Sequence, residues 1–118
     1  MTARKLAAIF GFLGVALGAF GAHGLKATLA QIPEGAEWWQ KATLYHLVHA
    51  AAMLVTGRAD GRVSAATWSF AAGITLFSGS LYAMALTDLR WLGAVTPVGG
   101  LALLSGWLLL LRSSSSSR

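Results

Sequence analysis

The chain contains no cysteine and few charged residues, and both shortages limit what it can be. Its 118 residues include only 11% Lys, Arg, Asp and Glu, less than half of the roughly 25% found in a typical soluble domain. A soluble fold of this length could not cover its surface with so few charges. The lack of cysteine excludes disulfides, iron–sulfur clusters and thiolate metal sites.

Long apolar runs take the place of charge, and 56% of the residues are hydrophobic. A helix needs about 20 residues to cross a ~30 Å hydrocarbon core. The hydrophobicity is continuous rather than alternating, which excludes a β-barrel. We therefore predict an all-α membrane protein with one domain over residues 1–112, whose spans lie at about 6–25, 38–56, 65–86 and 91–111.

The connections predict how these spans are arranged. Residues 57–62 and 87–90 are short charged turns, and short turns place consecutive helices side by side in opposite directions. We expect an antiparallel up-down-up-down bundle of four transmembrane helices. The second span is the least apolar because it holds two histidines and begins near Lys41. The serine-rich residues 113–118 are predicted to be a disordered tail.

The distribution of Lys and Arg predicts the orientation. Six of the nine Lys and Arg residues lie in the two terminal segments and in loop 57–62, so this side is expected to face the cytoplasm. The net charge of +5 is then explained by topology, and the expected partner is the lipid bilayer, not nucleic acid. Tryptophans should mark the interfaces, with Trp38, Trp39 and Trp91 outside and Trp68 and Trp107 nearer the inner side.

Glycines recur along one face of the first span. Small residues allow membrane helices to approach closely, so we predict that these glycines pack helices together. The contact could lie inside the bundle or between copies in a homo-oligomer, and Gly14 and Gly18 form a GxxxG pair. The predicted packing glycines are Gly11, Gly14, Gly18 and Gly21.

Polar residues at membrane depth form the candidate site, in the half nearer the outer surface. Ionisable groups inside a bilayer are costly and usually face other helices or water. Three interpretations are open: neutral hydrogen-bonded ties between helices, a metal site of His23, His46 and His49, or a path for protons or small solutes. The predicted polar cluster comprises His23, Tyr45, His46, His49, Ser78, Ser80, Tyr82 and Thr96.

Signals for catalysis are missing from this pattern. Both aspartates lie in loops, so no Ser/His/Asp set is available within the spans, and we predict no catalytic residues and no cofactor. Pro97 is expected to break the fourth helix and leave carbonyls unpaired near Gly93 and Ala94. Ser78 and Ser80 are the donors expected to satisfy them.

Four motifs in order resemble a known family. Residues 18–25 (GAFGAHGL), 45–49 (YHLVH), 76–82 (LFSGSLY) and 95–100 (VTPVGG) are similar to domain of unknown function family 423, the YgdD-like small inner-membrane proteins. The resemblance covers about residues 4–112 and implies a four-helix protein of the bacterial inner membrane with no assigned activity. The family pattern has Gln where His46 stands, which weakens the metal interpretation and favours hydrogen bonding.

The sequence therefore predicts a multi-pass membrane protein with both termini in the cytoplasm. We expect a structural or accessory component of the membrane that either forms a homo-oligomer or joins a larger membrane complex. The alternative hypothesis is a small conduit or carrier for a proton, small solute or metal ion that uses the polar cluster.

Overall fold

Helices make up nearly all of the computed structural model, which describes residues 1–116 and the side chains as far as residue 113. Within this range the extended backbone pairs only at an isolated bridge between Thr2 and Arg62. The prediction of an all-helical chain is confirmed. The elements are α1 (Ala3–Ala22), α2 (Lys26–Ala30), α3 (Gly35–Met53), α4 (Ala65–Gly73), the π-helical turn η1 (Ile74–Ser78), α5 (Gly79–Thr87), the 3₁₀ turn η2 (Arg90–Ala94) and α6 (Thr96–Ser116).

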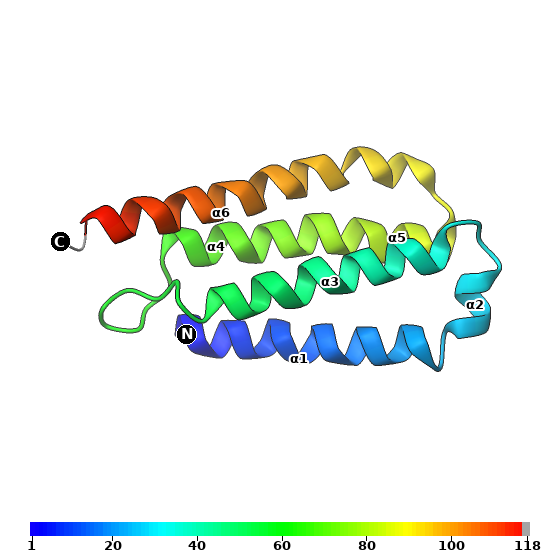
Figure 1. Cartoon of the computed structure of the whole chain (residues 1–118), viewed down its shortest axis with the longest axis horizontal. Helices are drawn as coiled ribbons and strands as arrows, with labels where there is room; N and C mark the ends of the chain where they lie inside the picture. The colour runs from blue at the N-terminus through cyan, green and yellow to red at the C-terminus, as the bar shows by residue number, and fades with distance from the viewer. Residues whose placement is uncertain (117–118) are drawn as a thin grey trace.

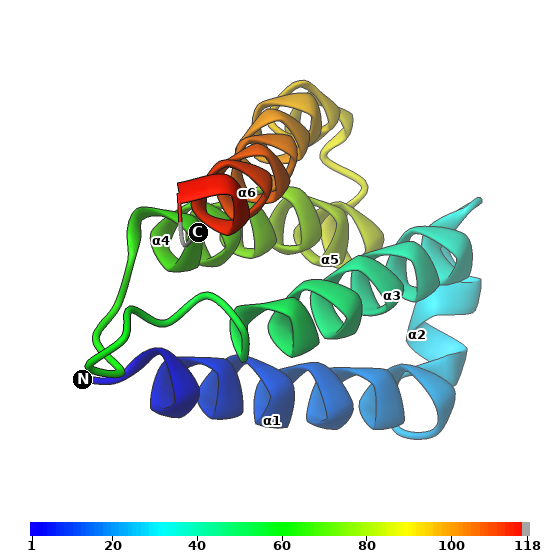
Figure 2. The same cartoon turned by 60° about the vertical axis from the view of Figure 1, so that its left-hand side comes forward.

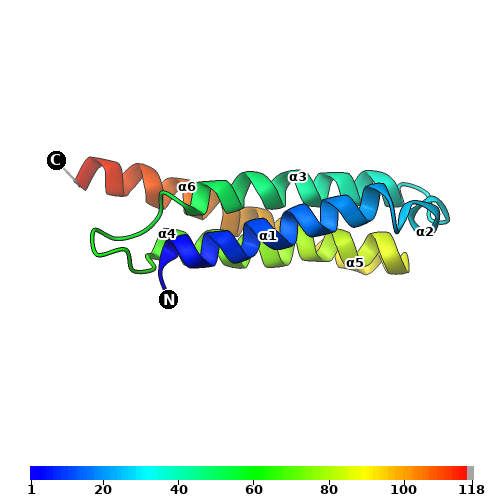
Figure 3. The same ribbon diagram turned by 90° about the horizontal axis from the view of Figure 1, so that it is seen from below.

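Four long helical segments lie side by side in the order α1, α3, α4–α5, α6, and consecutive segments run in opposite directions (Figure 1). The start of α1 and the last turns of α6 lie at one end, beside the loop that precedes α4, whereas α2 lies at the other end. The order is the same in the view turned by 60° (Figure 2). Seen from below, α3 and α4–α5 lie at different heights, so the row is staggered (Figure 3).

Local sequence explains where the segments begin. Thr2 caps α1, since its side chain accepts a hydrogen bond from the Lys5 amide at 3.1 Å. Ser64 caps α4 in the same way and forms a reciprocal capping box with Thr67. The helix that Ser64 caps begins at Ala65 and continues through η1 to Thr87, close to the third predicted span.

Pro97 lies at the start of α6 and not inside it, which corrects the predicted helix break. The helix begins at Thr96, after the 3₁₀ turn η2. A proline in the first turn removes an amide that has no partner within the helix in any case. The expected role of Ser78 and Ser80 as donors to carbonyls freed by Pro97 is therefore wrong.

The main core lies where α1, α3, α4 and α6 meet. Its buried residues are Ala7, Ala50, Met53, Phe70, Ala71, Ile74 and Leu103. Several are alanines, which let the helices approach closely and gain van der Waals contact. Two smaller clusters lie toward the α2 end, around Trp39 and around Leu81.

Three helical stretches among the described residues have the length and apolar composition to cross a membrane: Ala3–Ala22, Ala65–Thr87 and Arg90–Ser113. The helix α3 does not meet this criterion, and it corresponds to the second predicted span, which is the least apolar of the four. The helix α6 continues to Ser116 and so includes most of the tail that was predicted to be disordered. The remainder of that tail, residues 117–118, lies outside the described residues.

Candidate functional site

His46 connects three helices through both of its ring nitrogens. Its Nε2 lies 2.8 Å from the carbonyl oxygen of Phe10 on α1, and its Nδ1 lies 3.0 Å from the hydroxyl of Tyr82 on α5. The Tyr82 hydroxyl is also 3.3 Å from Oγ1 of Thr43, one turn before His46 on α3. The imidazole is buried, so this network joins α1, α3 and α5 away from water.

His49 forms a second connection, between α3 and α6. Its Nδ1 lies 2.7 Å from the carbonyl oxygen of Tyr45, and the indole Nε1 of Trp107 donates to its Nε2 at 3.0 Å. The Trp107 ring also packs edge-on against His49 and against Phe70 of the core. His49 is thereby held by the same residues that bring α4 and α6 together.

The partners of the two buried histidines require different neutral tautomers. An indole N–H can only donate, so Nε2 of His49 must accept and the proton must be on Nδ1, which donates to a carbonyl. A carbonyl can only accept, so Nε2 of His46 must carry its proton. In the neutral form of His46, Nδ1 can only accept, so it competes with Oγ1 of Thr43 for the single proton of the Tyr82 hydroxyl. Both ring nitrogens of each histidine lie within hydrogen-bond distance of a protein group.

The predicted serines and Thr96 form two further connections. Ser78 of η1 donates to the carbonyl oxygen of Ala42 on α3 at 2.7 Å. Ser80 of α5 lies 2.6 Å from Oγ1 of Thr96, at the start of α6, and donates to Phe77 within its own helix. These bonds connect α4–α5 to its neighbour on either side.

The structure distributes the predicted cluster over separate connections instead of gathering it in one site. His46 faces α1 and α5, whereas His49 faces α6, because a spacing of three residues leaves about 60° between side chains on a helix. His23 is exposed at the end of α1. Within the described residues no three His, Cys, Asp or Glu side chains are placed to hold a metal ion, so the predicted three-histidine set is not assembled.

The predicted packing glycines mostly contact α3. A Cβ at Gly14 would lie 2.6 Å from Leu47, one at Gly18 would lie 2.9 Å from Thr43, and one at Gly21 would lie 2.3 Å from Trp39. These three glycines therefore allow α1 and α3 to pack inside the chain. Gly11 has nothing within 4 Å and makes no such contact.

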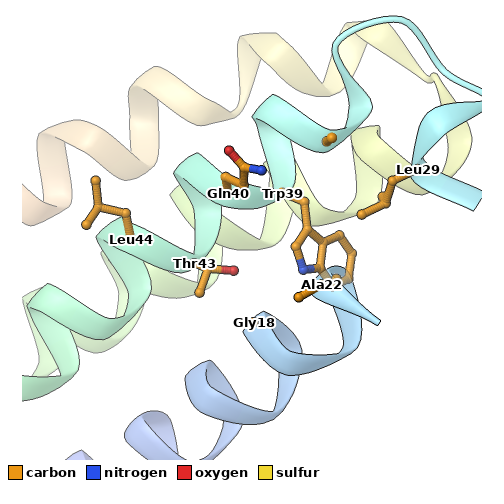
Figure 4. Close-up of a pocket in the computed structure, with 9 residues that line it drawn as sticks. Gly18, Ala22, Leu29, Trp39, Gln40, Thr43 and Leu44 are labelled. Carbon is orange, nitrogen blue, oxygen red and sulfur yellow. The ribbon is translucent and has the colours of Figure 1, made fainter. Parts of the chain in front are cut away.

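Trp39 forms a polar tie between α3 and α1, a role that its expected place among the tryptophans of the outer interface did not suggest. It is buried, and its Nε1 donates to the carbonyl oxygen of Leu17 at 2.8 Å. Figure 4 shows its ring pointing from α3 toward Gly18 and Ala22 of α1, beside a crevice of about 330 Å³. The sequence could have suggested that Trp39 packs against the glycines at positions 18 and 21 only if α1 and α3 were already known to be neighbours.

An open groove runs between α3 and α6 over His49. Its volume is about 490 Å³, and its lining is almost entirely apolar. Tyr45 stacks on His49 and packs against Phe77, and these three rings line the groove together. Such a surface suits hydrocarbon rather than water.

Ion pairs occur at the α2 end. Arg90 bonds Asp88 at 2.9 Å and Glu34 at 3.4 Å, and its guanidinium lies 5.0 Å from the ring centre of Trp38. About half of each charged side chain is exposed, so these pairs contribute little to stability. They connect the two loops at this end, and we assign them no chemistry.

Comparison with known proteins gives one consistent result. A family model described as "Protein of unknown function (DUF423)" matches residues 17–100. The chain is 46% identical to the UPF0382 inner membrane protein YgdD of Escherichia coli K12, with 94% of this chain and 89% of that protein covered. It is 43% identical to the UPF0382 membrane protein YwdK of Bacillus subtilis 168, with 89% of each covered. The UPF0382 membrane protein SH2409 of Staphylococcus haemolyticus is 41% identical over 92% of this chain and 91% of its own length. No solved structure matches.

Proposed function

We propose, on the premise that this chain belongs to the DUF423 family of membrane proteins as its motifs predicted, that it crosses the bacterial cytoplasmic membrane four times. Both termini lie in the cytoplasm in this proposal. The protein serves as a structural or accessory component of the membrane and not as an enzyme or a conduit.

The length and the bonding of α3 support a fourth span. Its 19 residues reach about 28 Å at 1.5 Å per residue, close to the thickness of the hydrocarbon core. Its low hydropathy comes partly from His46 and His49, which are buried against other helices. A hydropathy criterion counts them as if they faced lipid. Because both side chains are hydrogen-bonded inside the protein, they oppose the insertion of α3 into the membrane less than the hydropathy value implies.

The observation that carries the structural role is the complete pairing of polar groups at depth. Among the described residues, no buried side-chain nitrogen or oxygen lacks a hydrogen-bond partner. A path for protons or solutes needs polar groups that face a water-filled space. The ring nitrogens of His46 and His49 are instead occupied by protein partners, and the groove beside His49 is apolar.

An accessory role also requires a surface for association, either with a second copy or within a larger membrane complex. The exposed side of α1 supports this part of the proposal. Gly11 has open space beside it, and Phe12 and Val15 are largely exposed. A small residue between bulky apolar ones is a shape into which another membrane helix can pack.

Single cysteine variants test the four-span arrangement, because the natural sequence contains none. Gln31→Cys and Ala59→Cys introduce exposed thiols at opposite ends of the molecule. In intact spheroplasts, a membrane-impermeant maleimide should label the first variant and not the second, while both should react after lysis. Labelling of Ala59→Cys before lysis would contradict the proposed orientation.

Reconstitution into liposomes separates the structural role from the conduit. With a pH-sensitive dye inside the vesicles and an imposed pH gradient, the purified protein should give the same proton leak as empty vesicles. A leak that increases with protein content and disappears in a Tyr45→Phe, His49→Gln variant would overturn the structural proposal. The mass of the protein in lipid nanodiscs would report a homo-oligomer directly.

A further inference from the structure

The two ends of the molecule differ in charge. The terminal end, where α1 begins and the last turns of α6 lie, has five basic side chains among the described residues but only one acidic side chain, that of Asp60. At the α2 end, three acidic residues accompany three basic ones. The basic side chains at the terminal end are Arg4, Lys5, Arg58, Arg62 and Arg112.

No acidic side chain among the described residues forms an ion pair with the basic side chains at the terminal end. Among the described residues, the ion pairs involve Arg90 at the opposite end. The carboxylate of Asp60 accepts a hydrogen bond from the backbone amide of Arg62 at 2.9 Å and so closes its own loop. Exposed guanidinium groups without an acidic partner are available to an anion from outside.

Two of these arginines line one groove at this end. It has a volume of about 340 Å³ and lies between the loop before α4 and the last turns of α6. Arg58 and Arg112 both line it, and Val55, Leu109 and Leu110 supply an apolar side. The groove therefore combines two positive charges with a hydrocarbon surface.

Hydrogen bonds hold the loop side of this groove in place. Oγ1 of Thr56 lies 2.7 Å from Oγ1 of Thr67, and the Ser64 hydroxyl donates to the carbonyl oxygen of Thr56. The Arg58 amide donates to the carbonyl oxygen of Arg62 at 2.8 Å. The segment that carries Arg58 is thus fixed to the start of α4, and the groove is built before any ligand arrives.

We propose that this groove binds an anionic phospholipid, with the headgroup phosphate between Arg58 and Arg112 and an acyl chain along Leu109 and Leu110. Guanidinium groups match phosphate oxygens in geometry and charge. A free phosphate would use the arginines but not the apolar side, so the combination favours a lipid. The inference rests on the proposed four-span arrangement, which places this end at the cytoplasmic surface of the membrane.

Native mass spectrometry of the full chain in detergent tests the inference, with phosphatidylglycerol and phosphatidylcholine added in equal amounts. The wild type should retain phosphatidylglycerol in preference. In the double variant Arg58→Gln, Arg112→Gln that retention should fall about 25-fold, because each arginine near a membrane surface contributes about fivefold. The matched control Lys5→Gln, Arg62→Gln removes the same charge from the same end outside the groove and should retain the lipid like the wild type.

Three other results would overturn the proposed lipid site. Equal losses in both double variants would show diffuse surface charge and overturn the site. Equal retention of the two lipids by the wild type would also overturn it, as would displacement of the lipid by millimolar inorganic phosphate. Circular dichroism of each variant checks that it is folded. Because retention is measured in detergent, a failed orientation test would reject the cytoplasmic position proposed for this end without changing this result.

Discussion

Gly99 marks the closest approach between α6 and the π-helical turn, and replacing it with alanine should destabilise the protein. A Cβ at this position would lie 2.2 Å from the Phe77 amide nitrogen and 2.7 Å from the Phe77 Cα. Both are backbone atoms, so no side-chain rotation can relieve the overlap. Ordinary contact begins near 3.4 Å, and the two helices would have to separate by about 1 Å, which forfeits part of the dispersion energy along their interface.

Overpacking of this kind should cost about 1–3 kcal/mol, against which the better helix propensity of alanine returns up to about 1 kcal/mol, so the expected net loss is up to about 2 kcal/mol. Gly79→Ala is the matched control, because nothing lies within 4 Å of a Cβ there. Unfolding in mixed micelles with an increasing fraction of sodium dodecyl sulfate, followed by far-ultraviolet circular dichroism, measures both free energies. A Gly99→Ala protein as stable as Gly79→Ala would refute the packing of α6 on η1.

Three further predictions concern the helix contacts. Trp107→Phe should lower the free energy of unfolding by about 0.6–1.7 kcal/mol, the range for a hydrogen bond inside a membrane, while Trp91→Phe at an exposed position should leave it unchanged in the same titration. Gly18→Leu should separate α1 from α3 and lower the thermal unfolding midpoint, whereas Gly11→Leu should leave the midpoint unchanged and reduce any oligomer mass seen in nanodiscs. Tyr82→Phe should cost about 1 kcal/mol in the micelle titration, because both of its partners lose their common hydroxyl; an unchanged midpoint would mean that this network is not formed.

The helices could be predicted from the sequence because membrane insertion depends on summed properties. A run of about 20 apolar residues must satisfy its backbone within one helix when it enters lipid, whatever its neighbours are. The boundaries of α1 and α3 nevertheless lie three residues before the predicted ones. Capping by Thr2 and the turn at Glu34 set them, and hydropathy does not register either feature.

The grouping of the polar side chains could not be predicted, because it depends on helix rotation and on which helices are neighbours. His46 and His49 were expected to share one site, yet a difference of about 60° around α3 directs them to different partners. Trp107 was expected near the inner interface and is the donor to His49. Only the packing of both α3 and α6 against α4 brings the two side chains within reach of each other.

The tautomers of the histidine rings test the central claim most directly, that the deep polar side chains are ties between helices. The protein has three histidines, so selective ¹⁵N labelling gives a spectrum simple enough to assign. At pH 7.5 in micelles, His46 should show a proton on Nε2 and His49 a proton on Nδ1, each as a single fixed neutral tautomer, while the exposed His23 should average between forms. Rapid exchange between the two tautomers at His46 and His49, or the same tautomer at both, would contradict the claim that these side chains are ties between helices.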